Sequence, residues 1–343
     1  MTTSGKKNKN LPISEINLQR IHDAYFDAVT DDSFYPAVYI IEPTNFCNFS
    51  CIMCPNSKYR SKSLGKMKMR LFKKIVDEIA PYAKAIMLYW VGEPLLHPKL
   101  PEMIRYIKVR SEARVIISTN ASLLKGQLAR DLINSGMDEI IIGMDGDSPE
   151  TFEHIRVGGK FEEIVRNTEN FLELVGNKNK PTVVIQFLEM KANSKETKAF
   201  WDHWSKFNCY PLITWIDTWA GQMAELKLTA QQLSPYEDAL RKPCADLWYK
   251  MTINWQGQVT LCCHDWNAST ILGSLWDQSV MEIWHSSYLK YLRNEHQKGN
   301  FSVHNLCKDC FEWSTVEDEI AHWKAPHIGY SYDPKLRESE EQR

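Results

Sequence analysis

Residues 37–54 read AVYIIEPTNFCNFSCIMC, an apolar run followed at once by three cysteines. The run at 37–42 is short and rich in Val, Ile and Tyr, which predicts a buried strand. Cys47, Cys51 and Cys54 follow it with the spacing C-x3-C-x2-C. Since an iron–sulfur cluster takes up to four cysteine ligands, three thiolates leave one iron open to a cofactor or substrate. The stretch indicates a catalytic cluster; zinc ligands or unrelated thiols are the alternatives.

Five further apolar runs repeat this pattern. They cover residues 85–91, 114–118, 139–144, 182–188 and 211–216. Amphipathic stretches of helical period lie between them, so strand and helix alternate. Six such units are too few for a complete eight-unit barrel, and right-handed crossovers would curl them into an open one. We expect an α/β fold, a partial (β/α)6 TIM-like barrel, with its chemistry at the carboxyl ends of the strands.

Composition limits the function classes. The 343-residue chain carries 41 Lys and Arg against 43 Asp and Glu, so no overall positive charge favours nucleic acid or an anionic membrane. No apolar run approaches the roughly 20 residues of a membrane span, and no secretory signal opens the chain, so we expect a cytoplasmic protein. Nine cysteines in a reducing compartment indicate metal ligation or redox chemistry more than disulfides.

A second set of four cysteines lies near the C-terminus. Four thiols, separated by 17, 44 and 2 residues, are enough to close a metal site. Residues 248–262 read as two short strands turned at 256–257, a hairpin that delivers the second thiol. Zinc accepts the same ligands, and spacing alone does not distinguish the metals. The four are Cys244, Cys262, Cys307 and Cys310.

The composition and pattern of the sequence change beyond about residue 225. A helix-like stretch at 226–240 leads into a region rich in Cys, Trp and His. We therefore expect a small second domain of α+β type that binds a metal cluster. The predicted boundaries are an N-terminal extension at 1–36, the barrel at 37–225, the cluster domain at 226–330 and a mobile tail at 331–343.

Polar side chains recur where the predicted strands end. Gly92 and Glu93, in WVGEP after the second strand, combine a close backbone approach with a carboxylate that can bind an ammonium group. Similar residues follow the next strands, although each could equally serve as a turn, an N-cap or an ion pair. They are Ser118 and Asn120, Asp145 with Arg156 eleven residues later, and Gln186.

These motifs together resemble the radical SAM superfamily over roughly residues 37–220, with Val91 in place of the first glycine of the family's GGEP motif. The C-terminal set resembles the twitch module, a shortened SPASM domain. The layout is similar to that of amino-inositol dehydrogenases of the butirosin pathway.

The resemblance implies two cofactor sites. Cys47, Cys51 and Cys54 would hold a [4Fe-4S] cluster whose open iron binds S-adenosyl-L-methionine. The four C-terminal cysteines would hold an auxiliary [4Fe-4S] cluster, and flavodoxin or ferredoxin would supply electrons. The residues implied near S-adenosyl-L-methionine are Gly92, Glu93, Ser118, Asn120, Asp145, Arg156 and Gln186.

The family chemistry implies an oxidoreductase in which a 5′-deoxyadenosyl radical abstracts a substrate hydrogen. Our leading hypothesis is two-electron oxidation of a polyol, amino sugar or cyclitol, with the second cluster as electron acceptor. Asp217, Asp265, His264 and Arg156 are candidate proton acceptors or substrate-binding residues.

Three other functions stay open. The first is an epimerase in which the thiol of Cys263, or less directly Cys209, returns a hydrogen atom; Cys263 could also be only a small buried side chain. The second is modification of a ribosomally made peptide, although residues 1–36 show no leader-binding pattern. The third is a zinc-stabilised binding protein without enzymatic activity.

Tryptophan is abundant, with 12 residues in the chain. Five fall near the expected domain interface, where they could wall a dry pocket or simply pack in the core. They are Trp215, Trp219, Trp248, Trp255 and Trp266.

Overall fold

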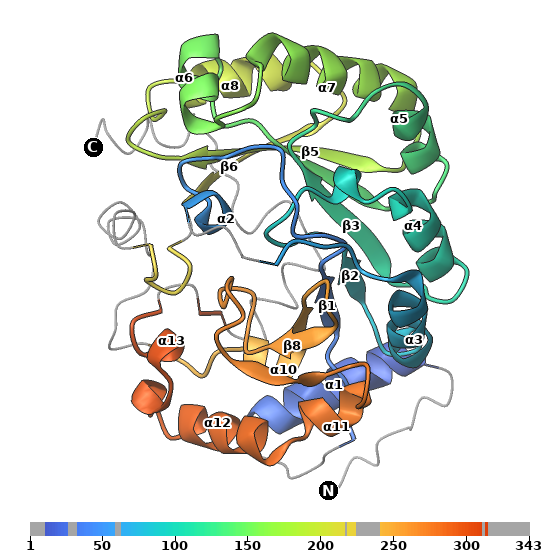
Figure 1. Cartoon of the computed structure of the whole chain (residues 1–343), viewed down its shortest axis with the longest axis vertical. Coiled ribbons are helices and arrows are strands. Elements are labelled where there is room, and N and C mark those ends of the chain that lie inside the picture. The colour runs from blue at the N-terminus through green and yellow to red at the C-terminus, as the bar shows by residue number, and fades with distance from the viewer. Residues whose placement is uncertain are drawn as a thin grey trace, which may run out of the picture.

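A computed structural model describes residues 11–26, 33–58, 63–216, 218–223, 241–310 and 313–314. Its centre is one nine-stranded sheet in the order β6-β5-β4-β3-β2-β1-β7-β8-β9. Helices follow one another around the outside of the curved sheet (Figure 1). Among the helices of the described ranges, none combines the length and the apolar character that crossing a membrane requires.

The first six strands form the predicted open barrel, and every neighbouring pair among them is parallel. All six predicted apolar runs are confirmed as strands. The second run gives the shortest strand, because the chain leaves the ladder and turns into a loop. The strands are β1 (Val38–Ile41), β2 (Ala85–Met87), β3 (Arg114–Thr119), β4 (Glu139–Gly143), β5 (Thr182–Glu189) and β6 (Tyr210–Trp215).

Helices cover the barrel because one face of each is apolar. In α3 the buried positions Leu71, Phe72, Ile75, Val76 and Ile79 recur every three or four residues, which places them on one face toward the sheet. The barrel helices are α2 (Pro55–Lys58), α3 (Met69–Ile79), η1 (Pro94–Leu96), α4 (Leu100–Lys108), α5 (Gly126–Ile133), α6 (Pro149–Ile155), α7 (Phe161–Val175) and α8 (Thr197–Trp204).

The C-terminal region continues the barrel sheet. β7 (Lys250–Ile253) pairs in parallel with β1, and Val38 lies opposite Lys250. β8 (Gln258–Thr260) pairs antiparallel with β7, and β9 (Ile271–Ser274) pairs antiparallel with β8. The predicted hairpin is therefore present, but it adds strands to the first sheet and forms no sheet of its own. The helices here are α10 (Asp246–Tyr249), α11 (Val280–Trp284), α12 (Ser287–Gln297), η4 (Phe301–Val303) and α13 (Asn305–Lys308).

The N-terminal helix α1 (Ile13–Phe26), which the sequence did not predict, packs against the C-terminal region (Figure 1). The hydroxyl of Tyr25 donates to the carbonyl oxygen of Pro243 at 2.6 Å. The ring of Tyr25 also meets that of Trp248 edge-on, with 5.2 Å between centroids. The predicted helix at 226–240 and the predicted tail at 331–343 lie outside the described residues.

Candidate active site

The loop after β1 brings three thiols to one cavity. Cys47, Cys51 and Cys54 all line this cavity, which has a volume of about 250 Å³. Ser57, in α2, keeps the loop compact because its hydroxyl lies 2.6 Å from the carbonyl oxygen of Cys51 and 2.7 Å from that of Cys54. The three predicted cluster ligands therefore share one wall at the carboxyl end of the first strand.

Burial controls the ionisation of these thiols. It raises the pKa of Cys47 to about 11 and that of Cys51 to about 12, and it also raises the pKa of Cys54. The guanidinium of Arg156 lowers these pKa values only in part. At neutral pH the thiols stay protonated unless a cation compensates their charge, and metal ligation does so with release of protons. The pocket is suited to a metal cluster and poorly suited to free thiolates.

Gly92 lies where two loops meet backbone to backbone. A methyl group on Gly92 would lie 2.0 Å from the carbonyl oxygen of Thr44. Next to it, the N–H of Glu93 donates to the carbonyl oxygen of Phe46 at 2.7 Å. Only glycine fits here, and the close approach places the loop after β2 against the cysteine loop.

Glu93 lines the cavity, but its buried carboxylate already accepts three hydrogen bonds. Oε1 accepts from the N–H of Leu95 at 2.9 Å and from Oγ1 of Thr119 at 2.7 Å. Oε2 accepts from the N–H of Asn120 at 2.8 Å. Burial raises the pKa of Glu93, and these donors oppose the shift. The side chain thus ties the loop after β2 to the loop after β3, while its predicted contact with an ammonium group stays a prediction.

Three more of the predicted residues line the same cavity: Ser118, Asn120 and Gln186. Asn120 is held in place because its Nδ2 donates to Oδ1 of Asn48 at 3.0 Å and its Oδ1 accepts from the hydroxyl of Ser122 at 2.7 Å. Ser118 and Asn120 come from the end of β3, and Gln186 comes from β5, so the two strands that flank β4 both contribute to the wall.

Arg156 and Asp145 form an ion pair at the edge of the cavity. Nε of Arg156 donates to Oδ2 of Asp145 at 2.7 Å, and Oδ1 of Asp145 accepts from the N–H of Leu188 at 2.8 Å. Arg156 lines the cavity. Asp145 is fully buried and is absent from the described residues that line it. The predicted cofactor ligand Asp145 therefore lies behind Arg156 and orients it.

The sequence did not identify several apolar walls of the cavity. Tyr89 and Trp90 line the cavity, but they fall in an apolar run that was interpreted only as a strand. Gly143 also lines it and makes room for Arg156, because a methyl group on Gly143 would lie 2.1 Å from the guanidinium. Trp219 was expected near a pocket and lines this one, in a turn where its φ is +55°. The side chain of Trp215 lies outside the described part.

The second set of cysteines converges from separate elements. Cys244 precedes α10, Cys262 follows β8, and Cys307 lies in α13 with Cys310 just after it. Burial raises the pKa of Cys244, and charges on Asp246, Cys262 and Cys307 would raise it further. Burial likewise raises the pKa of Cys307 to about 12. The arrangement is suited to a buried site with several thiolate ligands and a compensating cation.

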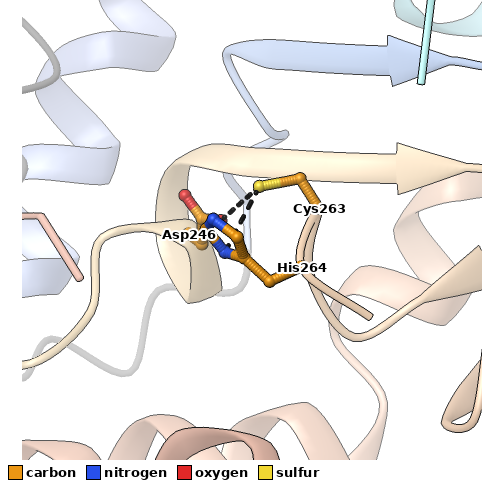
Figure 2. Close-up of side chains that lie close together, drawn as sticks. All are labelled: Asp246, Cys263 and His264. Carbon is orange, nitrogen blue, oxygen red and sulfur yellow. Dashed lines mark hydrogen bonds between the residues drawn. The ribbon is translucent and has the colours of Figure 1, made fainter. Parts of the chain in front are cut away.

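Cys263 belongs to a different group of side chains, shown in Figure 2. Its sulfur lies 3.6 Å from Oδ2 of Asp246 and 3.6 Å from Nδ1 of His264. One ligand atom from each of the three residues lies within 4.8 Å of the others. Cys263 is absent from the described residues that line the cavity, although its carbonyl oxygen accepts from Nε1 of Trp90 at 2.7 Å. The thiol of Cys263, which was predicted as a possible hydrogen-atom donor, is therefore not in direct contact with the cavity.

The other candidate proton acceptors are placed unequally. Asp265 is fully buried and organises its own loop, since it accepts from the N–H and hydroxyl of Ser269 and from the N–H of Thr270. His264 faces Cys263. Asp217 lies outside the described residues. Of the four, Arg156 is the one that lines the cavity, among residues that the structure describes.

Comparison with known proteins identifies both regions. Residues 41–187 match the radical SAM superfamily, and residues 244–311 match the SPASM iron–sulfur cluster-binding domain. Over 162 residues the chain is 32% identical to the tungsten-containing aldehyde ferredoxin oxidoreductase cofactor-modifying protein of Pyrococcus furiosus, which covers 46% of this chain and 44% of that protein. Against several curated relatives the chain spans less than two thirds of their length, from 38% to 63%.

Two further similarities extend over most of the chain. S-adenosyl-L-methionine-dependent 2-deoxy-scyllo-inosamine dehydrogenase of Niallia circulans is 22% identical over 81% of this chain and 94% of its own. The solved structure of BtrN in complex with AdoMet and 2-DOIA shares the fold, with a TM-score of 0.58 and 19% identity over 80% of this chain and 92% of BtrN. The cofactors of this chain are thus a [4Fe-4S] cluster with S-adenosyl-L-methionine in the first region and auxiliary iron–sulfur in the second.

Proposed function

We propose that this protein, which carries a radical SAM domain and a SPASM-type domain, oxidises a hydroxyl- or amine-bearing carbon of a polyol, amino sugar or cyclitol by two electrons. The observation that best supports this proposal is that the three thiols, Arg156 and Gly92 all line the same cavity. The dehydrogenase name of the relative matched over most of both chains supports the reaction class.

The residues present fit the cofactors. The three thiols, of which Cys51 is buried and the other two are partly buried, need a cation to ionise. The backbone at Gly92 lies too close to Thr44 for any side chain, which leaves main-chain groups to meet a ligand. Cys47, Cys51 and Cys54 would hold the cluster, and Gly92, Ser118, Asn120, Arg156 and Gln186 would hold S-adenosyl-L-methionine. Bound together, these groups supply a carbon radical that removes a hydrogen atom from the substrate. The auxiliary cluster, on the second set of cysteines, would supply an acceptor for the one electron that remains, while the proton released with it passes to solvent.

The chain's own residues then orient the substrate and exclude water. Arg156 is fixed by Asp145 and presents its remaining N–H donors to the cavity, where a hydroxyl or carboxylate can accept them. Burial raises the pKa of Tyr89, so its hydroxyl keeps its proton, which it donates to Sδ of Met87 at 3.5 Å, and the residue adds to the cavity wall. Trp90, Ile216 and Trp219 form apolar walls, which strengthens each polar contact inside.

Oxidation is favoured over epimerisation by the position of Cys263. An epimerase of this kind needs a thiol at the cavity to return a hydrogen atom. The thiol of Cys263 instead faces Asp246 and His264 (Figure 2). Cys209 donates to the carbonyl oxygen of Trp204 at 3.3 Å, just before β6 and away from the strand ends that carry the cavity.

The test is iron and sulfide analysis of the anaerobically reconstituted protein, with 5′-deoxyadenosine formation under reductant. The wild type is expected to hold about eight irons and to cleave S-adenosyl-L-methionine. The variant Cys47→Ala/Cys51→Ala/Cys54→Ala should keep about four irons and lose cleavage. Cys209→Ala, a matched thiol outside both sets, should behave as the wild type. Zinc in place of iron in the wild type would overturn the assignment.

The reaction itself is tested with deuterated cyclitols and amino sugars. Oxidation moves one deuterium into 5′-deoxyadenosine and gives a product lighter by two hydrogens. A product of unchanged mass, with activity abolished in Cys263→Ala while both clusters remain, would replace oxidation by epimerisation.

A further inference from the structure

A second cavity of about 730 Å³ adjoins the first, and Trp90 and Val91 line both. Its wall carries seven side-chain amides and three indoles. Of the described residues that line it, Glu42 alone is ionisable, and none is Lys or Arg. Such a wall suits an uncharged ligand with many hydroxyl groups, because each amide can both donate and accept. It offers no cation to a phosphate.

Part of this amide surface has no partner within the described chain. The side chain of Gln256 and Nε2 of Gln258 make no hydrogen bond to any described residue, and the same holds for Oε1 of Gln222. Other amides are fixed; Asn254, for example, accepts from the N–H groups of Gln256 and Gln258 at 3.0 Å each. The turn between β7 and β8 is thus fixed by Asn254, while the side chains of Gln256 and Gln258 keep hydrogen-bond donors and acceptors that a ligand could use.

Glu42 is the strongest sign of a ligand. It directly follows β1, is 1% exposed and lines the cavity. Its Oε2 accepts from the N–H of Trp255 at 3.1 Å, while no donor among the described residues meets hydrogen-bond geometry at its buried Oε1; the nearby amide of Val91 acts on the carboxyl only by lowering its pKa. A buried acceptor left without a donor lowers stability, so native proteins rarely keep one unless a ligand or water supplies the donor.

We infer that this second cavity binds a glycosyl ring attached to the reacting ring of the substrate, with a hydroxyl or amino group of that ring donating to Oε1 of Glu42. This assignment rests on the proposed function. A volume of about 730 Å³ is in the range for ligands of drug size, beyond a single six-membered ring. The indole faces of Trp255 and Trp266 suit the C–H face of a sugar ring.

A peptide fits this wall less well. Extended peptides commonly bind by adding a strand to an open sheet edge. β1, β7 and β8 are each paired on both sides, and β9, the sheet-edge strand beside the cavity among the described strands, contributes only Ile271 to the wall. Recognition here depends on side-chain amides and indoles, as a polyol requires.

The test is calorimetric binding to the anaerobic holoenzyme in the presence of S-adenosyl-L-methionine. The probes are glucosamine, the disaccharide of two β-1,4-linked glucosamines, cellobiose and tetraglycine. We expect both disaccharides to bind at least about tenfold more tightly than glucosamine. Gln256→Ala and Trp266→Ala should each weaken the disaccharides about tenfold, while Glu42→Gln should weaken the glucosamine disaccharide more than cellobiose. The exposed controls Gln127→Ala and Tyr291→Ala should leave affinity unchanged.

Three outcomes would overturn the inference: tight binding of tetraglycine in place of the disaccharides, disaccharide binding that neither cavity variant weakens, or no binding of any probe. None of them affects iron content or cleavage of S-adenosyl-L-methionine. Failure here is therefore distinguishable from failure of the proposed function, which those two measurements decide.

Discussion

Glu42 shows how one side chain can link stability to pH. Burial raises its pKa to about 7, and the backbone amides of Trp255 and Val91 oppose the shift only in part. The folded protein therefore binds a proton more tightly at Glu42 than the unfolded chain does. Between roughly pH 4.5 and 7 this site makes stability fall as pH rises, because the unfolded state ionises first.

We predict that Glu42→Gln stabilises the protein at high pH only. A pKa shift from 4.5 to about 7 means that ionisation of Glu42 lowers the free energy of unfolding by about 3 kcal/mol at pH 8. The neutral amide of Gln removes this cost and still accepts the hydrogen bond from the N–H of Trp255. The melting temperature of the anaerobic holoenzyme should rise by several degrees at pH 8 and stay nearly unchanged at pH 5. The exposed control Glu112→Gln should show no such difference. An equal effect of Glu42→Gln at both pH values would contradict the linkage.

The site residues differ in how far the sequence revealed them. Cysteine spacing indicated all seven thiols, because a metal centre requires chemically specific ligands. The glycine-glutamate pair and Arg156 were indicated by their places after strands. Tyr89 and Trp90 could not be separated from strand residues, because an apolar run looks the same whether its side chains face a core or a cavity. Asp145 was expected near the site, and only the fold shows that Arg156 lies between it and the cavity.

At the scale of elements, the loops after β1 and β2 depend on each other. Gly92 lies against the backbone of Thr44, and Asn56 of α2 donates to the carbonyl oxygen of Val91 at 2.9 Å. The cysteine loop is thus shaped by a loop that follows another strand. Collision with backbone cannot be relieved by rotation of a side chain.

Gly92→Ala should therefore damage the cluster site. The added methyl group, 2.0 Å from Thr44 O, would push the two loops apart, and overpacking of this kind destabilises by about 1–3 kcal/mol. We expect iron content to fall toward about four per chain and affinity for S-adenosyl-L-methionine to drop at least about tenfold in equilibrium dialysis. Gly126→Ala is the control, since its φ of +58° gives backbone strain but no atom lies within 4 Å. Full iron content and affinity in Gly92→Ala would show that the loops can separate without harm.

The strands were predictable and their partners were not. Each barrel strand is a compact apolar run, and right-handed crossovers fix the order of neighbours along the chain. β7 was expected in a hairpin, which local turn chemistry at Gly257 encodes, with a φ of +84°. Its parallel pairing with β1 is a contact between segments far apart in the sequence. Hydrophobic periodicity predicts that a segment is a strand, but it does not predict which strand pairs with it. The same limit hid α1, whose partner α10 lies at the other end of the chain.

At the scale of the whole molecule, barrel and C-terminal region share one sheet and one core. The buried core runs without interruption from Ile41 through Ile253 to Leu292. The predicted boundary near residue 225 lies outside the described residues, and β7, which follows it, is paired with β1 of the barrel. The two regions are therefore expected to support each other's stability.

We predict a single cooperative unfolding transition for the anaerobic holoenzyme. Loss of helical circular dichroism and the change in tryptophan fluorescence should coincide in a urea titration, because neither region keeps a complete core without the other. Two separate transitions, with the cluster domain melting at lower urea, would show that the shared sheet does not couple the regions.

The pairing of β1 with β7 also bears on how the chain is made. Val38 and Lys250 lie opposite each other, yet 212 residues separate them (250 − 38). At roughly 5–20 residues per second, a ribosome releases β1 roughly 10–40 s before β7. Throughout that interval one side of β1 is an open, apolar strand edge, the feature most prone to pair with another nascent chain. Shielding by a chaperone during translation would therefore matter most for the strand that carries the cluster loop.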